Sequence, residues 1–208
     1  MTNIPRTGSI KDPVINDIIK YEWDMFQETE NIGGRASCQD QYDTFYANRY
    51  SQHNALELDT LESYRKDLAD AKAIGRNLIT EKYAFMMEFT DPAYYKQNLE
   101  AHMPALSDEK ASLIAQIVSR QILGYREYAA KYPYMAGAGR PIEEGGLDTS
   151  IKQYSVGEYK TYSDNTLRLL LRDVENSGNF VLNIQNTLIS FYGYDSLEAA
   201  EESQKRRG

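Results

Sequence analysis

The sequence predicts an all-α fold, a single helical-bundle domain of mostly antiparallel helices with one long loop rich in glycine and proline. Apolar residues recur every three to four positions over most of the chain, which is the spacing of one face of an α-helix. No stretch shows the alternation of apolar and polar residues that is typical of a half-buried strand. The length of 208 residues suits one domain, placed here at residues 13–195, after an extended arm at residues 1–12.

Composition disfavours some functional classes and excludes others. The net charge is −8, from 31 acidic and 23 basic residues, and nucleic-acid binding needs clustered Lys and Arg for phosphate contacts. The single cysteine, Cys38, excludes an internal disulfide and a multi-cysteine zinc or iron–sulfur site. No signal peptide and no apolar run of about 20 residues is present. We therefore expect a cytoplasmic protein that needs no cofactor and contacts neither membrane nor nucleic acid.

The first three helices follow from local signals. The first begins at Asp12 and Pro13, because Asp is a preferred N-cap and Pro is favoured in the first turn. It is expected to stop near Asn31, since the glycines that follow tolerate the left-handed conformation that ends many helices. A second helix is predicted at about residues 36–53, and a third begins near Leu56.

The third helix is predicted to be long. Gly75 interrupts it only weakly, because the apolar period continues past this residue. The segment Thr90-Asp91-Pro92 ends this helix or opens a short helix through Leu99. Ser107, followed by acidic residues, predicts the start of the next helix, which runs through Tyr128.

The clearest predicted loop is the glycine- and proline-rich stretch from Tyr132 to Ser150. Loops of this length without secondary structure are usually functional or disordered. We expect this one to cover the mouth of a pocket, with Arg140 reaching into the site. Residues 196–208 form a charged helix or a tail. Between the loop and this end, helices are predicted at about residues 151–162, 165–174 and 180–191.

Glu22 lies in the middle of an apolar stripe. It follows Ile18 and Ile19 by one helical turn and precedes Phe26 by one turn. Burying an unpaired carboxylate is unfavourable, so Glu22 must be paired, hydrogen-bonded or neutralised. Two interpretations stay open: a salt bridge to an arginine on a neighbouring helix, or a role in a ligand pocket, where perturbed carboxylates cluster.

The second predicted helix carries a polar stripe at steps of four, three, four, three and four residues. Polar stripes usually face solvent. The opposite side of this helix, however, has few apolar residues that could form a buried face, so part of the polar stripe is expected to face inward. We expect Arg35, Gln39 and Arg49 to reach toward Glu22. The full stripe is Arg35, Gln39, Tyr42, Tyr46, Arg49 and His53.

The stretch Gly33-Gly34-Arg35 joins the first two helices. It is either a capping turn or an anion site, because free N–H groups at the start of the next helix and a bidentate Arg35 both favour an anion. It is not a phosphate-binding P-loop, which requires a Lys-Ser/Thr pair after the glycines and a preceding strand.

Other catalytic constellations are excluded. The only histidines are His53 and His102, and neither follows a glutamate by three residues, so no helical di-iron pattern exists. No His-Glu-x-x-His motif is present, and no metal ligand is predicted. Cys38 fits a small buried hydrophobe better than a nucleophile.

Several unusual strings resemble, in order, those of the bacterial family called domain of unknown function 4125, over roughly residues 13–195. They are YEWDMF (21–26), NIGGRASCQ (31–39), RYSQ (49–52), GRNLITEKYAFMMEFTDPAYY (75–95), KYP (131–133), GRP (139–141) and TYSDNTL (161–167). The family's name implies no activity. Some relatives are encoded beside, or fused to, a predicted nucleotidyltransferase-like domain, which the resemblance makes a possible partner.

The resemblance marks polar positions that are too numerous for a purely structural bundle, and thus implies a polar central pocket. The chain departs from the family pattern at Phe85 and Val156, where the family usually has arginine. This departure bears on whether it shares a ligand with its relatives. The positions carried over are Glu22, Trp23, Met25, Phe26, Asn31, Gly33, Gly34, Arg35, Cys38, Gln39, Arg49, Ser51, Gln52, Arg76, Asn77, Glu81, Lys82, Tyr83, Glu88, Arg140, Glu158, Thr161, Tyr162 and Ser163.

The leading hypothesis is a small-molecule enzyme or binding protein for an anionic or zwitterionic ligand, with a pocket built from the first three long helices. The alternative is a non-catalytic interaction module that docks on a nucleotidyltransferase-like partner. Polar residues that converge in a cavity favour the first, and an open surface with aromatic neighbours favours the second. The catalytic candidates are Glu22, Glu81 and Tyr83; the ligand-binding candidates are Trp23, Asn31, Arg35, Gln39, Arg49, Gln52, Arg76, Arg140 and Tyr162.

Overall fold

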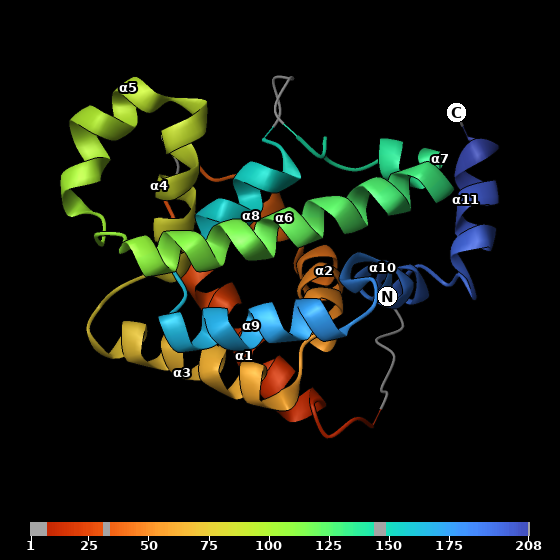
Figure 1. Ribbon diagram of the computed structural model, residues 1–208, viewed down its shortest axis with the longest axis horizontal. Coiled ribbons are helices and arrows are strands. Elements are labelled where there is room, and N and C mark those ends of the chain that lie inside the picture. Colours follow the sequence, from red (N-terminus) through yellow and green to blue (C-terminus); the bar gives the residue numbers. More distant parts are fainter. Residues whose placement is uncertain (1–7, 31–33, 144–148, 208) are drawn as a thin grey trace.

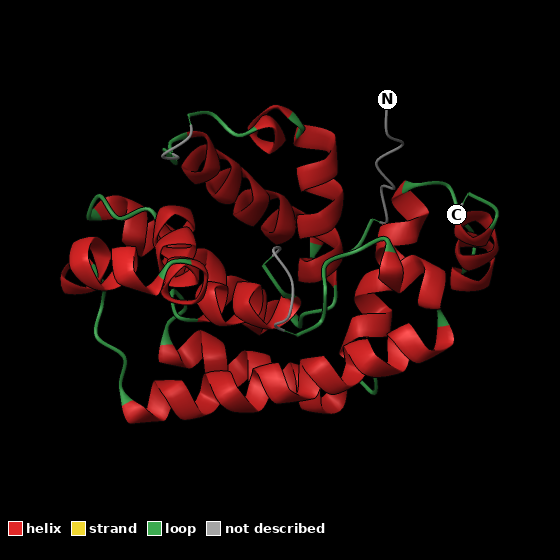
Figure 2. Cartoon of the chain, turned by 90° about the horizontal axis from the view of Figure 1, so that it is seen from above, coloured by secondary structure: helices red, strands yellow, loops and turns green. Residues whose placement is uncertain are grey.

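The computed structural model describes residues 8–30, 34–143 and 149–207, and these form helices and no strand (Figures 1 and 2). The all-α prediction is therefore confirmed. The helices are α1 (Asp12–Gln27), α2 (Tyr42–Asn54), α3 (Leu58–Ala73), α4 (Leu78–Thr90), α5 (Pro92–Tyr94), α6 (Asp108–Lys131), α7 (Pro133–Gly137), α8 (Ile151–Tyr159), α9 (Asp164–Asn176), α10 (Phe180–Phe191) and α11 (Leu197–Lys205).

The long helix α6 crosses the molecule and packs against α8, α9 and α10 (Figure 1). On the other side of the main core, α1 packs against α2, α3 and α4, while α4 packs closely on α8. Ile18, Leu61, Ile117 and Leu167, from four different helices, are fully buried in this core. A second, smaller apolar cluster joins α11 and α10 to the end of α6.

The predicted helix at residues 36–53 is wrong as one continuous element. A 3-10 helix covers Ser37–Asp40, and α2 begins only at Tyr42. The reason is Gln39, whose buried side chain donates from Nε2 to the carbonyl oxygens of Phe26 at 2.7 Å and Thr29 at 3.0 Å. Gln39 thus satisfies carbonyls that the end of α1 leaves without helical partners.

The prediction that Gly75 interrupts its helix only weakly is also wrong. Gly75 has a φ of +74° and ends α3. Its N–H donates to the Lys72 carbonyl, and the N–H of Arg76 donates to the Ala71 carbonyl, which is the Schellman pattern. Asn77 then caps α4, because its side-chain oxygen accepts from the next helix's free N–H groups.

The stretch predicted as a loop from Tyr132 to Ser150 begins with α7. Glu201 of α11 explains this helix, since its carboxylate accepts from the N–H groups of Tyr134 at 3.0 Å and Met135 at 2.8 Å. A carboxylate at a helix N-terminus is stabilising. The C-terminal segment, which was expected to be a charged helix or a tail, forms the helix α11. Residues 1–7, Asn31, Gly33 and 144–148 lie outside the described residues, so the predictions for these positions stay predictions.

Gly157 of α8 lies close against α4. A Cβ atom added there would lie 2.7 Å from Cγ of Met86 and 3.0 Å from the Lys82 carbonyl oxygen. Overpacking of this kind typically costs about 1–3 kcal/mol. We therefore expect Gly157→Ala to lower the free energy of unfolding by that amount in urea denaturation.

The matched control is Gly137→Ala at the end of α7, where an added Cβ meets nothing within 4 Å. This variant should keep or slightly raise stability, because alanine restricts the unfolded chain. Equal stabilities for the two variants would contradict the close packing of α4 on α8.

Candidate functional site

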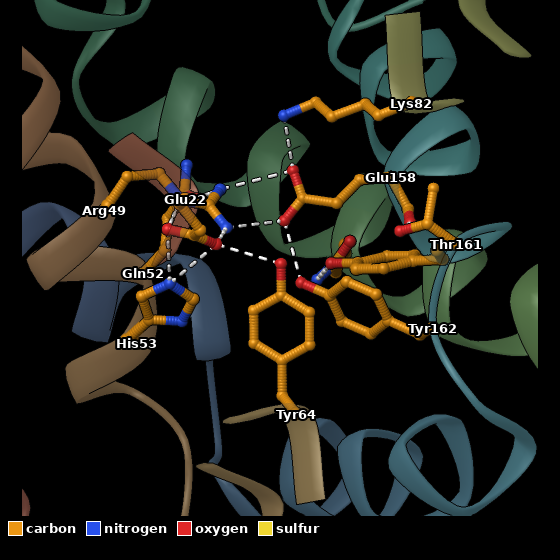
Figure 3. A network of polar contacts seen from close by, with 11 residues as sticks. Glu22, Arg49, Gln52, His53, Tyr64, Lys82, Glu158, Thr161 and Tyr162 are labelled. Atoms are coloured by element: carbon orange, nitrogen blue, oxygen red, sulfur yellow. Dashed lines mark hydrogen bonds and ion pairs between the residues drawn. The ribbon is translucent and has the colours of Figure 1, made fainter. Parts of the chain in front are cut away.

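A buried ion pair joins α1 and α2 (Figure 3). Glu22 is 0% exposed, and Arg49 is also buried. Nε of Arg49 donates to Oε2 of Glu22 at 2.8 Å, and Nη2 donates to Oε1. The structure thus confirms that Glu22 pairs with an arginine on a neighbouring helix, in the bidentate geometry that guanidinium and carboxylate favour.

A second carboxylate, Glu158 of α8, lies on the other side of Arg49 (Figure 3). It accepts from Nη2 of Arg49 at 2.9 Å, from Nζ of Lys82 at 2.7 Å and from the hydroxyl of Tyr162 at 2.8 Å. The two N–H groups on Nη1 of Arg49 donate to Oε1 of Gln52 at 2.5 Å and to Oε2 of Glu158 at 3.2 Å. All five N–H donors of Arg49 are therefore used within the protein.

Two further residues complete the shell around Glu22. The hydroxyl of Tyr64 donates to Oε1 at 2.9 Å, and Nε2 of His53 lies 3.1 Å from Oε2. Among the described residues, no buried side-chain nitrogen or oxygen lacks a hydrogen-bond partner. The two carboxylates, Glu22 and Glu158, thus face the two cations Arg49 and Lys82, and pairing of this kind is the condition under which buried charges are tolerated.

The network holds both carboxylates ionised. Burial raises the pKa of Glu22, but Arg49 and His53 outweigh it and lower that pKa from 4.5 to about 2. Burial likewise opposes ionisation of Glu158, yet Arg49 and Lys82 hold its pKa well below the usual range. Burial lowers the pKa of Lys82, and the attraction of Glu158 outweighs this and raises it. Lys82 is therefore a cation and not a nucleophile at neutral pH.

A cavity of about 600 Å³ lies beside this network. Its wall comes from α2, α4, α6, α8 and α10 and from the segment 135–142, so it extends well beyond the first three predicted helices. Five of the predicted site residues line it: Arg49, Gln52, Tyr83, Arg140 and Tyr162. Glu22 does not line it. The segment 135–142 contributes Arg140 to the lining, and the prediction that this loop covers the mouth of the cavity stays a prediction.

One part of the wall combines phenols with cations. The rings of Tyr83, Tyr125 and Tyr154 line the cavity, and their hydroxyl groups make no hydrogen bond to another described residue. Nζ of Lys82 lies 3.6 Å from the centre of the Tyr154 ring, and Cζ of Arg140 lies 5.2 Å from it. Burial raises the pKa of Tyr83 and raises that of Tyr125 to about 12, so both phenols remain proton donors at neutral pH.

Arg35 and Gln39 do not reach Glu22, so that prediction is wrong. Arg35 is half-exposed and pairs with Asp40 at 2.8 Å and with Oε1 of Gln27 at 2.6 Å. The guanidinium is thus occupied in fixing the turn after Gly34, which has a φ of +87°. Gln39 caps the end of α1 instead.

Three more candidates, Trp23, Arg76 and Glu81, lie outside the cavity wall. Arg76 and Glu81 form a two-fold hydrogen-bonded pair, at 2.8 and 2.6 Å, near the surface. Trp23 packs against the rings of Tyr42 and Phe45, each with its ring centre 5.0 Å away. Cys38 is exposed at the cavity wall, so its interpretation as a buried hydrophobe is wrong.

Sequence reasoning assigned no role to Lys82 and Glu158, although both belong to the family pattern. The signal used for Glu22 was available for both. Lys82 follows Ile79 and precedes Phe85 by three residues each, and Glu158 lies four residues after Tyr154 and four before Tyr162. Each charge therefore stands within an apolar or aromatic helical stripe.

Within the described ranges, His, Cys, Asp and Glu side chains nowhere gather in threes in a way that would hold a metal ion. Among the described helices, none pairs sufficient length with the apolar composition that a membrane crossing requires.

Comparison with known proteins gives a family and no described activity. No curated protein and no solved structure matches the chain. The family described as "Protein of unknown function (DUF4125)" matches residues 12–202, nearly the whole length and all the residues of the buried network. The chain therefore belongs to the DUF4125 family.

Proposed function

We propose that the protein binds a small anionic molecule in the cavity between α2, α4, α6 and α8. The observation that carries this proposal is the presence of three tyrosines, Tyr83, Tyr125 and Tyr154, in the cavity lining, with Lys82 and Arg140 beside the ring of Tyr154. Each hydroxyl is a hydrogen-bond donor without a partner among the described residues. Donors and cations that converge on one cavity fit a carboxylate or a phosphate.

Lys82 and Arg140 supply the charge in this proposal, and Arg49 does not. All five N–H groups of Arg49 already bind protein oxygens, so the guanidinium has no donor left for a ligand. The ammonium of Lys82 donates to Glu158 and retains further N–H groups, since lysine has three. Arg140 is exposed, with Nη1 3.3 Å from the Thr149 carbonyl, and it remains available at the cavity mouth.

Binding is better supported than acid–base catalysis by Glu22. That carboxylate is fully buried, does not line the cavity and has a pKa near 2, so it has no proton to donate at neutral pH. In the proposal Glu22 positions Arg49, which in turn holds Glu158 beside Lys82. The convergence of Arg49, Gln52 and Tyr162 on a cavity also favours a ligand site over a docking module for a nucleotidyltransferase-like partner.

The test is whether inorganic phosphate, phenyl phosphate or benzoate binds to the protein. Binding is detected as a rise in the melting temperature of the protein, measured at constant ionic strength. A ligand that binds only the folded state raises the melting temperature. Tyr125→Phe and Tyr154→Phe should fold normally, because the lost hydroxyls bind no described residue. They should weaken binding about tenfold or more, since a hydrogen bond to a charged group contributes roughly 1.5–3 kcal/mol.

The matched control is Tyr192→Phe, which removes an exposed hydroxyl away from the cavity. It should bind the same probes as the unmodified protein does. The proposal fails when none of the three probes shifts the melting temperature, and it also fails when the cavity variants respond as the control does.

A further inference from the structure

The cavity face of α2 carries amide side chains with fixed orientation. Asn48 and Gln52 line the cavity four residues apart, which places them on one face of α2, and Gln41, the residue before this helix, lines it as well. Nδ2 of Asn48 donates to the Thr44 carbonyl at 2.8 Å, so its Oδ1 remains as an acceptor. Oε1 of Gln52 accepts from Arg49, which can only donate, so Nε2 of Gln52 remains as a donor.

An aromatic wall stands in the same cavity. Phe45 of α2 stacks on Phe26 with ring centres 5.5 Å apart and planes at 12°. Phe26 in turn stacks on Tyr83, with centres 6.2 Å apart. All three rings contribute to the lining. A planar ring system can stack on such a wall whatever its hydrogen-bonding pattern.

The amide face and the cationic cluster are adjacent. Gln52 contacts Arg49 at 2.5 Å, Arg49 contacts Glu158 at 2.9 Å, and Glu158 contacts Lys82 at 2.7 Å. The cavity volume of about 600 Å³ lies within the range of roughly 300–1,000 Å³ that is usual for small-molecule sites. One ligand can therefore present an anion to Lys82 and a planar, hydrogen-bonding ring to α2.

We infer that the ligand is a nucleoside monophosphate, with its phosphate at Lys82 and Arg140 and its base between the aromatic wall and Asn48. This inference rests on the proposed function and names its ligand class. A nucleobase presents donors and acceptors side by side on one edge, and Asn and Gln are the side chains that pair with such edges. The net charge of −8 disfavours a nucleic-acid strand, so the ligand is a single nucleotide.

The experiment is calorimetric titration of the full chain with the 5′-monophosphates of adenosine, guanosine, cytidine and uridine. Ribose 5-phosphate and phenyl phosphate serve as probes that lack a base. At least one nucleotide should bind ten times or more as tightly as ribose 5-phosphate. Asn48→Ala should remove most of that preference and leave ribose 5-phosphate binding unchanged, whereas Tyr154→Phe should weaken both.

The control for Asn48→Ala is Asn98→Ala. Asn98 is an exposed asparagine outside the cavity that makes the same type of bond, from Nδ2 to the carbonyl four residues earlier, at 3.1 Å. It should leave every affinity unchanged. If phenyl phosphate binds as tightly as each of the four nucleotides, the nucleotide inference is overturned and the anion site remains. Absence of binding by every phosphate compound overturns both.

Discussion

Replacement of Arg49 with alanine is expected to lower the free energy of unfolding by about 3–5 kcal/mol, a large share of the roughly 5–15 kcal/mol that is typical of a native protein. The reason is the pair of carboxylates that Arg49 joins. Glu22 and Glu158 are 0% and 8% exposed, and both would lose the same cation. An uncompensated buried charge is far more destabilising than a lost surface contact.

Chemical denaturation with urea measures this effect, and Arg49→Lys keeps the experiment informative when the alanine variant does not fold. Lysine retains the charge but cannot form the bidentate hydrogen bonds of arginine. The stability of Arg49→Lys should therefore lie between those of the unmodified protein and Arg49→Ala. The matched control is Arg76→Ala, which breaks a half-exposed pair with Glu81 and should cost no more than about 1 kcal/mol. Equal losses for Arg49→Ala and Arg76→Ala would contradict the central position of Arg49.

Acidification is expected to destabilise the protein steeply once the pH falls below about 4.5. The pKa of Glu22 is about 2 in the folded protein and near 4.5 when the chain is unfolded, so the unfolded state binds more protons between these values. The stabilisation by Glu22 is therefore fully present above pH 4.5 and is lost as the pH falls toward 2. Glu158, whose pKa is also lowered, acts in the same direction.

The free energy of unfolding, measured by denaturant titration at a series of pH values, checks this expectation. Glu22→Gln should be less stable at neutral pH and should show a flatter fall between pH 4.5 and 2, because one of the two titrating carboxylates is gone. Glu109→Gln, at an exposed pair with Arg168, serves as the control and should keep the steep fall. An unchanged slope in Glu22→Gln would mean that Glu22 does not titrate as described.

The helices that the sequence predicts well are those with strong periodicity and a local start signal. Helix α6 begins after Ser107, whose hydroxyl accepts from the Lys110 N–H as an N-cap should, and α10 matches its predicted range. The pairing of Glu22 with an arginine also followed from the sequence, because a carboxylate within an apolar stripe requires a partner.

The errors arise where distant residues override a local pattern. The helical period around residues 36–40 does not reflect the bonds of Gln39 to the carbonyls of Phe26 and Thr29, at and just after the end of α1 and ten or more residues earlier in the chain. Gly75 is an exception, because its left-handed conformation and the Schellman bonds to the carbonyls of Lys72 and Ala71 are local. Helix α7 depends on Glu201, more than sixty residues later. No single-segment pattern contains the contacts of Gln39 and Glu201.

The site was predicted in part for the same reason. Arg49, Gln52, Tyr83, Arg140 and Tyr162 line one cavity, but its wall also needs α6 and α10, whose contribution depends on how the helices pack. Arg35 looked like an anion ligand because it follows two glycines at a helix start. In the structure its donors are used by Asp40, Gln27 and a backbone carbonyl.

The measurement that tests the anion site most directly is a crystal structure of the protein with phenyl phosphate. The account predicts the phosphate within roughly 2.5–3.2 Å of Nζ of Lys82 and of at least two of the hydroxyls of Tyr83, Tyr125 and Tyr154. A phosphate bound instead at Arg35, beside the turn at Gly34, with the cavity hydroxyls uncontacted, would contradict it.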